Sequence, residues 1–187
     1  MRFSSLEIPD VLLIEPKIFE DERGIVFESY RENLIEEKIG RKISFVQENI
    51  CVSKKGFVRG LHYQTYPMEQ DKLVRVTRGE VFDVVVDLRK NLPTFGQYIT
   101  QVLSSKNRKQ LFIPFGFAHG FLTLSDESEF SYKLSNYYSP ENQHCLLWSD
   151  PQLAIPWPYD FKRIKASIRD QQGHFFDHTN LEASKID

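Results

Sequence analysis

The sequence is poor in cysteine, in net charge and in long apolar runs, and each shortage excludes a class of protein. Two cysteines, Cys51 and Cys145, are too few for a disulfide framework, and neither stands in a Cys-x-x-Cys motif, which predicts free thiols in a reducing compartment. No apolar run reaches the roughly 18 residues of a membrane-spanning helix. A net charge of −2 argues against a nucleic-acid partner. We therefore expect a cytoplasmic protein that binds neither membranes nor nucleic acids.

Helical periodicity is also scarce, whereas strand-like runs are frequent. Residues 32–40 alone suggest a short amphipathic helix, which would end at Gly40. No shift in composition divides the chain, so residues 1–187 are expected to form a single all-β domain, a sandwich or barrel with a few short helices. The predicted strands are 10–16, 24–30, 43–53, 57–64, 72–78, 80–88, 97–103, 110–115, 120–125 and 128–138.

Two of these runs carry unusual polar residues. Strict alternation along 57–64 would place Arg59 on one face with Leu61 and Tyr63, and His62 on the other, so one face must hold polar chemistry or the strand must lie at an edge. The run 80–88 has one apolar face, expected to be core, and one mixed face. The apolar face consists of Phe82, Val84, Val86 and Leu88. The mixed face consists of Val81, Asp83, Val85 and Asp87.

His62 and His119 both occur in strand contexts, which makes a metal site worth testing. A barrel metal site built on His62 would need a second histidine two residues away, and these positions hold Gly60 and Gln64. We therefore predict no metal. Either histidine can also be read as a hydrogen-bonded core residue, as an isolated histidine more often is.

The remaining chemistry open to such a histidine is proton abstraction next to a carbonyl. This reaction needs a cation near the enolate oxygen, a proton donor on the opposite face, and an anchor for the rest of the substrate. Lys72 is a candidate cation, Tyr132 a candidate donor, and Arg59 and His119 are candidate phosphate ligands. Each also has an ordinary alternative: a solvated strand face for Lys72, a core position for Tyr132 and a structural ion pair for Arg59.

A set of motifs across residues 21–151 resembles one family, the dTDP-4-dehydrorhamnose 3,5-epimerases. The motifs are, in order, DERGIVFESY, FVQEN, VRGLHYQ, DKLVRV, RGEVFDVVVDLR, FIPFGFAHGF, YKLSNYYSP and LLWSDP. The resemblance implies a cupin-type double-stranded β-helix (jelly roll) and a homodimer without metal or organic cofactor. It also implies conversion of dTDP-4-dehydro-6-deoxy-D-glucose into dTDP-4-dehydro-L-rhamnose, a product used for surface polysaccharide.

The resemblance also implies roles for individual residues. His62 matches the base that removes the C3 and C5 protons, Asp170 the carboxylate that orients it, Tyr132 the proton donor on the other face, and Lys72 the enolate-side cation. Asp83 is expected to orient His119. The substrate-binding positions implied are Arg23, Glu28, Gln47, Asn49, Arg59, His119, Tyr138, Gln143 and Arg169, with the segment around Arg23 reaching a neighbouring subunit's site.

Three positions depart from the family pattern without touching the base or the donor. Gln143 stands where Glu is common and loses a charge, Arg169 stands where Lys is common and keeps it, and Phe115 replaces a polar residue at the rim.

The alternatives to a double epimerase are an enzyme that inverts only C3 or C5, a ketoisomerase, a non-catalytic sugar-nucleotide-binding cupin and a metal-dependent cupin oxygenase.

Overall fold

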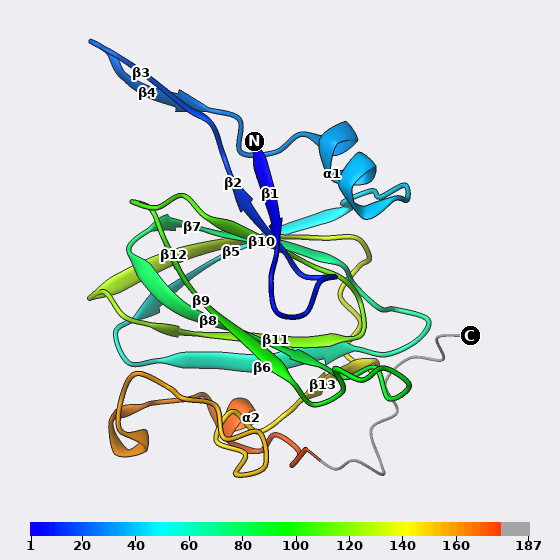
Figure 1. Ribbon diagram of the computed structural model, residues 1–187. Helices are drawn as coiled ribbons and strands as arrows, with labels where there is room; N and C mark the ends of the chain where they lie inside the picture. The colour runs from blue at the N-terminus through cyan, green and yellow to red at the C-terminus, as the bar shows by residue number, and fades with distance from the viewer. Residues whose placement is uncertain (177–187) are drawn as a thin grey trace.

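The computed structural model describes residues 1–176. They form two facing antiparallel β-sheets and, over residues 146–176, a C-terminal layer (Figure 1). One sheet has six strands in the order β1 (Arg2–Ser5), β2 (Leu12–Glu15), β10 (Gln110–Ile113), β7 (Lys72–Arg78), β12 (Glu127–Leu134) and β5 (Gln47–Lys54). The other has five, in the order β13 (Gln143–Cys145), β6 (Val58–Gln64), β11 (Phe117–Thr123), β8 (Glu80–Asp87) and β9 (Tyr98–Ser104). This two-sheet arrangement is the predicted cupin-type jelly roll.

All ten predicted strands contain strand residues, and the predicted helix is confirmed. Helix α1 (Glu32–Ile39) ends at Gly40, whose φ of 73° lets its amide donate to the carbonyl of Glu36 at 2.9 Å. Three strands were not predicted, namely β1, β13 and β3 (Ile18–Asp21). They are three or four residues long, and their residues, RFSS, IFED and QHC, form no alternating apolar run.

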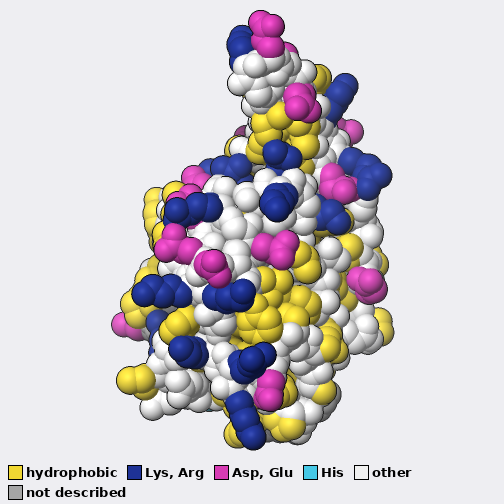
Figure 2. Space-filling model, turned by 90° about the vertical axis from the view of Figure 1, so that its left-hand side faces the viewer, with side chains coloured by type: hydrophobic (Ala, Val, Ile, Leu, Met, Phe, Trp, Pro, Cys, Tyr) yellow, Lys and Arg dark blue, Asp and Glu magenta, His cyan; other side chains and the backbone are white. Residues whose placement is uncertain are grey.

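Strand β3 pairs with β4 (Gly24–Phe27) in a two-stranded hairpin that projects from the body (Figures 1 and 2). Its side chains are unusual for an exposed ribbon, because Ile18, Phe19, Ile25 and Val26 are all exposed to solvent.

No helix among residues 1–176 is both long and apolar enough to cross a membrane.

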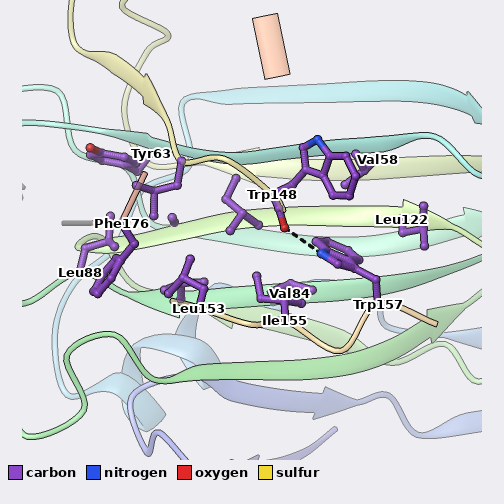
Figure 3. Packing of buried hydrophobic residues seen from close by; sticks show 14 of the residues in the cluster. Val58, Tyr63, Val84, Leu88, Leu122, Trp148, Leu153, Ile155, Trp157 and Phe176 are labelled. Carbon is purple, nitrogen blue, oxygen red and sulfur yellow. Dashed lines mark hydrogen bonds between the residues drawn. The ribbon is translucent and has the colours of Figure 1, made fainter. Parts of the chain in front are cut away.

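Strand β8 is buried on both faces, and its apolar face and its mixed face pack against different parts of the protein. Its apolar face, which includes Val84 and continues to Leu88 just after the strand, points away from the other sheet and packs under the C-terminal layer (Figure 3). That layer contributes Trp148 and Trp157, and the indole Nε1 of Trp157 donates to the carbonyl of Trp148 at 2.8 Å. The mixed face therefore lines the space between the sheets, with Asp83 fully buried there.

The prediction for the faces of β6 was wrong. Between its pairings His62↔His119 and Arg59↔Phe121, β6 contains one more residue than β11, so the strand bulges and the alternation is interrupted. As a result, Arg59 and His62 line the same cavity. Leu61 instead is buried in the hydrophobic cluster that includes Trp148 and Trp157.

Glycine makes this close strand contact possible. Gly60 has φ +118°, and a Cβ there would lie 2.7 Å from the Cα of Gly120 and from the carbonyl oxygen of His119. The bulge and the spacing of the two histidine-bearing strands thus depend on glycine at both positions.

The C-terminal layer contains the 3₁₀ turn η1 (Phe161–Arg163) and the short helix α2 (Ile168–Gln171), which lies against β6. Helix α2 begins at Ser167, whose Oγ accepts from the backbone amide of Asp170 at 3.1 Å. This cap fixes the helical turn that places the Asp170 side chain beneath β6.

Candidate active site

A cavity of about 410 Å³ opens between the two sheets, and most of the predicted site residues line it. Its walls come from both sheets, so a bound molecule would have the five-stranded sheet on one side and the six-stranded sheet on the other. The predicted residues in its lining are Gln47, Asn49, Arg59, His62, Lys72, His119, Tyr132, Tyr138, Gln143 and Arg169.

His62 forms a close pair with Asp170. The imidazole Nε2 of His62 lies 2.6 Å from Oδ1 of Asp170, and the two side chains are 29% and 6% exposed. Burial pushes the pKa of Asp170 up, but the hydrogen bonds from His62, Ser167 and the backbone of Gly60 outweigh it and hold this pKa below its usual value. The ionised carboxylate holds the proton on Nε2, which leaves Nδ1 of His62 free to accept another proton.

Tyr132 stands on the facing wall. It belongs to β12 of the six-stranded sheet, opposite Asn49 of β5, whereas His62 belongs to the five-stranded sheet. Burial raises the pKa of Tyr132, and a hydrogen bond with Asn49 offsets part of this rise. The phenol is therefore protonated at neutral pH, as a proton donor must be.

Lys72 opens β7 and reaches across to the other sheet, where its Nζ donates to the carbonyl oxygen of His62 at 2.9 Å. Burial lowers the pKa of Lys72 to about 8, while the nearby carboxylate of Asp83 acts in the opposite direction. Lys72 thus remains mostly cationic at neutral pH but loses its charge in mildly alkaline solution.

A second histidine–aspartate pair lies next to the first. Nε2 of His119 is 2.9 Å and 3.1 Å from the two carboxylate oxygens of Asp83, and these side chains are 8% and 0% exposed. Burial raises the pKa of Asp83, although His119 and Lys72 pull it down. The expected contact between Asp83 and His119 is therefore present.

A chain of hydrogen bonds joins the rim of the cavity to Asn49. Arg169 Nη1 donates to the hydroxyl of Tyr138 at 3.3 Å, the Tyr138 amide donates to Gln47 Oε1 at 2.9 Å, and Gln47 Nε2 donates to Asn49 Oδ1 at 3.0 Å. Gln143 adds a buried Oε1 with no hydrogen-bond partner in residues 1–176, an acceptor available to a ligand.

Sequence reasoning missed Gln64, which holds the loop that carries Tyr138. Its Nε2 donates to the carbonyls of Met68 and Tyr137 at 2.5 and 3.1 Å, and its Oε1 accepts from the Ser139 amide at 2.8 Å. The available signal was its position two residues after His62, on the same face of β6. Gln70, Phe121 and Phe130 also line the cavity and were not predicted.

Two predicted binding residues lie outside the cavity of their own chain. Arg23 is at the tip of the projecting hairpin, 84% exposed and 2.6 Å from Asp21, and Glu28 is 3.5 Å from Arg31.

A second, larger cavity of about 530 Å³ contains Phe115 but no predicted site residue. Volume therefore does not identify the site, whereas the chemistry of the lining does.

One group of side chains has the composition of a metal site. His62, Cys145 and Asp170 each present a ligand atom, and these atoms lie within 4.8 Å of one another, the one such group in residues 1–176. Burial and the neighbouring Asp170 raise the pKa of the Cys145 thiol to about 12, so without a metal it is a protonated and unreactive thiol.

The fold and cavity together define a class, namely a cupin-type barrel that presents a histidine–aspartate pair on one wall and a protonated tyrosine on the other. Such a site can remove a proton from carbon on one face of a molecule and return one on the other face.

Comparisons with known proteins identify the family. The family model for dTDP-4-dehydrorhamnose 3,5-epimerase matches residues 5–178. The chain is 57% identical to the dTDP-4-dehydrorhamnose 3,5-epimerase of Salmonella typhimurium, over 93% of this chain and 94% of that protein. The chain therefore belongs to the dTDP-4-dehydrorhamnose 3,5-epimerase family, and it is an epimerase, an enzyme of the isomerase class.

Two solved structures are also similar. A dTDP-6-deoxy-D-glucose-3,5-epimerase from Legionella pneumophila in complex with dTDP-4-keto-L-rhamnose has a TM-score of 0.89 and 45% identity, covering 93% of this chain and 92% of that one. A 3'-monoepimerase from Streptomyces bikiniensis in complex with dTDP-quinovose has a TM-score of 0.85 and 32% identity, covering 91% and 86%.

Proposed function

We propose that this protein inverts C3 and C5 of dTDP-4-dehydro-6-deoxy-D-glucose and so produces dTDP-4-dehydro-L-rhamnose. The observation that carries the proposal is the position of His62, with Asp170 behind it, and Tyr132 on facing sheets of one cavity. Inversion of a carbon centre requires removal of a proton from one face and delivery to the other, and two walls with opposite roles meet this requirement.

The reaction runs through an enolate. Nδ1 of His62 takes the proton from C3 or C5, and the electrons of that bond pass to the C4 ketone oxygen. Lys72 supplies positive charge for the enolate, and the Tyr132 hydroxyl delivers a proton to the opposite face of the same carbon. Exchange with solvent returns His62 to its neutral form and Tyr132 to the phenol, and the second centre follows. No cofactor is required, because the ketone itself acidifies both positions.

The rest of the cavity is suited to a nucleoside diphosphate. Arg59 and Arg169 provide donors for phosphate oxygens, His119 lines the cavity with them, and Tyr138 offers an aromatic ring for a base to stack on. Gln47, Asn49 and Gln143 provide polar groups for the nucleoside and the sugar. The dTDP-sugars bound to the Legionella and Streptomyces proteins support this assignment.

We further propose a homodimer in which the β3–β4 hairpin of each subunit reaches the cavity of the other. The exposed apolar side chains of the hairpin and the position of Arg23 and Glu28 away from their own cavity support this arrangement. A cytoplasmic location is also proposed, because a charged dTDP-sugar does not cross a bilayer unaided.

A second candidate is inversion at C3 alone, which the similarity to the Streptomyces 3'-monoepimerase favours. Proton NMR of the substrate with the purified protein in D₂O separates the two. Deuterium at both C3 and C5, with reduction of the product giving dTDP-L-rhamnose, is the expected result. Deuterium at one carbon identifies a mono-epimerase, and deuterium at neither would overturn both candidates.

A further inference from the structure

Cys145 has no part in the proposed reaction, yet it lies beside the proposed base. It belongs to β13, where it is the cross-strand partner of His62, and its Sγ is 3.9 Å from Oδ1 of Asp170. The same Oδ1 is 2.6 Å from Nε2 of His62. A nitrogen, a sulfur and an oxygen from three different elements thus converge just behind the cavity wall.

We propose that His62, Cys145 and Asp170 form a binding site for a thiophilic divalent cation, Zn²⁺, and that the bound ion inhibits the enzyme. Zinc binds histidine nitrogen, cysteine sulfur and carboxylate oxygen at about 2.0–2.3 Å, which spaces the ligand atoms of a tetrahedral site by roughly 3.3–3.8 Å. The observed separations of 2.6 and 3.9 Å lie on either side of that range. All three ligand atoms lie within 4.8 Å of one another, so side-chain shifts of about 1 Å bring them to tetrahedral spacing, and a water completes the coordination.

The charges of the site also match a divalent ion. The Asp170 carboxylate and a Cys145 thiolate together carry two negative charges, and the imidazole of His62 is neutral, so a zinc complex of the three is neutral overall. Neutrality matters because Cys145 and Asp170 are both buried. Zinc displaces the thiol proton to solvent, and the proton on Nε2 of His62 is replaced by one on Nδ1.

This proton arrangement explains the inhibition, a consequence that rests on the proposed function. With zinc on Nε2, Nδ1 of His62 carries a hydrogen and has no free electron pair, so it cannot take a proton from C3 or C5. The metal therefore acts in the opposite sense from a cofactor: zinc inhibits the enzyme and a chelator restores it.

The direct test is a Co²⁺ titration of the full-length protein, because thiolate-bound Co²⁺ gives a charge-transfer band in the near ultraviolet. We expect the band to saturate at one equivalent, to disappear in Cys145→Ser, and to persist in Cys51→Ser. Cys51 is the matched control because it is the other cysteine of the chain and also lines the cavity. No band in the wild type, or a band that survives Cys145→Ser, would overturn the proposal.

Two further measurements complete the test, and the first of them needs neither the variant nor the activity. On the wild-type protein, Zn²⁺ should shift the ¹⁵N resonance of His62 Nε2 and leave that of His119 unchanged; the reverse pattern contradicts the site. Zn²⁺ should also stop solvent exchange into the substrate, with at least about tenfold weaker inhibition in Cys145→Ser. A cobalt band in a protein without exchange activity would refute the proposed function and leave the metal site standing.

Discussion

The two histidine–aspartate pairs of the cavity use the same residue types in different surroundings. His62 and His119 are cross-strand partners on β6 and β11, so the pairs are neighbours. Asp170 comes from a separate helical turn and its pKa is lowered, whereas Asp83 is on the adjacent strand β8 and burial raises its pKa. The environment, and not the residue pairing, therefore distinguishes the two pairs.

The exposure of the two histidines supports the same division. His62 is 29% exposed and lines the cavity with a carboxylate fixed behind it, as a base that must reach substrate requires. His119 is nearly enclosed, and its partner Asp83 also acts on Lys72. We interpret the first pair as the base and the second as a fixed charge arrangement that binds substrate and supports the cation.

After loss of the base itself, the largest effect should come from the carboxylate of the first pair. Asp170→Asn removes the charge that fixes the proton on Nε2 of His62, and by analogy with other histidine–aspartate systems the turnover should fall by up to about 10⁴-fold. Asp83→Asn is the matched change in the second pair and should lose far less of the deuterium-exchange rate. Equal losses in the two variants would remove the distinction between the pairs.

Tyr132→Phe tests whether the first pair acts on one face only. Inversion should fall by about 10²–10⁴-fold, the usual contribution of a positioned acid. His62 can still remove a proton and return deuterium to the same face, so we expect exchange without inversion when both are followed by NMR in D₂O. If inversion continues at the parent rate, Tyr132 is not the donor.

Gly60→Ala tests the strand contact that brings the two pairs together. The added Cβ would lie 2.7 Å from backbone atoms of β11, and φ at Gly60 is +118°. Together these should lower the free energy of unfolding by about 2 kcal/mol or more, measured by denaturant titration. Gly40→Ala is the control, because it has a positive φ without any close atom and should cost only about 1 kcal/mol.

The smallest effect concerns Lys72, which contacts one pair and is influenced by the other. In buffer containing a chelator, turnover should decline as the pH rises through about 8, where Lys72 loses its proton. Lys72→Arg should remove this decline because arginine keeps its charge, and Asp83→Asn should move it to lower pH because the carboxylate that favours the cation is gone. A decline that neither variant moves would belong to another group.

Much of the fold could be predicted because its signals are local. Strand-like runs separated by turn residues identified ten strands, and Gly40 identified the end of α1. The motifs around His62, Lys72 and Tyr132 indicated which residues share a cavity, and the structure brings them to it. Asp170, more than one hundred residues after His62, was predicted through the family resemblance alone.

The remaining features depend on contacts that one strand's pattern does not contain. The bulge at Gly60 requires Gly120 on the neighbouring strand, which the pattern of β6 does not contain. The period-two rule ignores the bulge and therefore placed Arg59 and His62 on opposite faces. Both faces of β8 are buried, because the C-terminal layer covers the apolar one, and no local pattern states what will cover a strand. Arg23 lies outside its own cavity, where it pairs with Asp21, and only the proposed homodimer would bring it to a second cavity.

The most direct test of the account compares His62→Asn with His119→Asn in one experiment. Each variant is incubated with dTDP-4-dehydro-6-deoxy-D-glucose in D₂O, while NMR follows the C3 and C5 protons and calorimetry follows dTDP binding. We expect His62→Asn to bind dTDP but to lose exchange at both carbons, whereas His119→Asn should bind more weakly and still exchange both protons at saturating substrate. Exchange at the parent rate in His62→Asn, or its loss in His119→Asn alone, would contradict the assignment of His62 as the base.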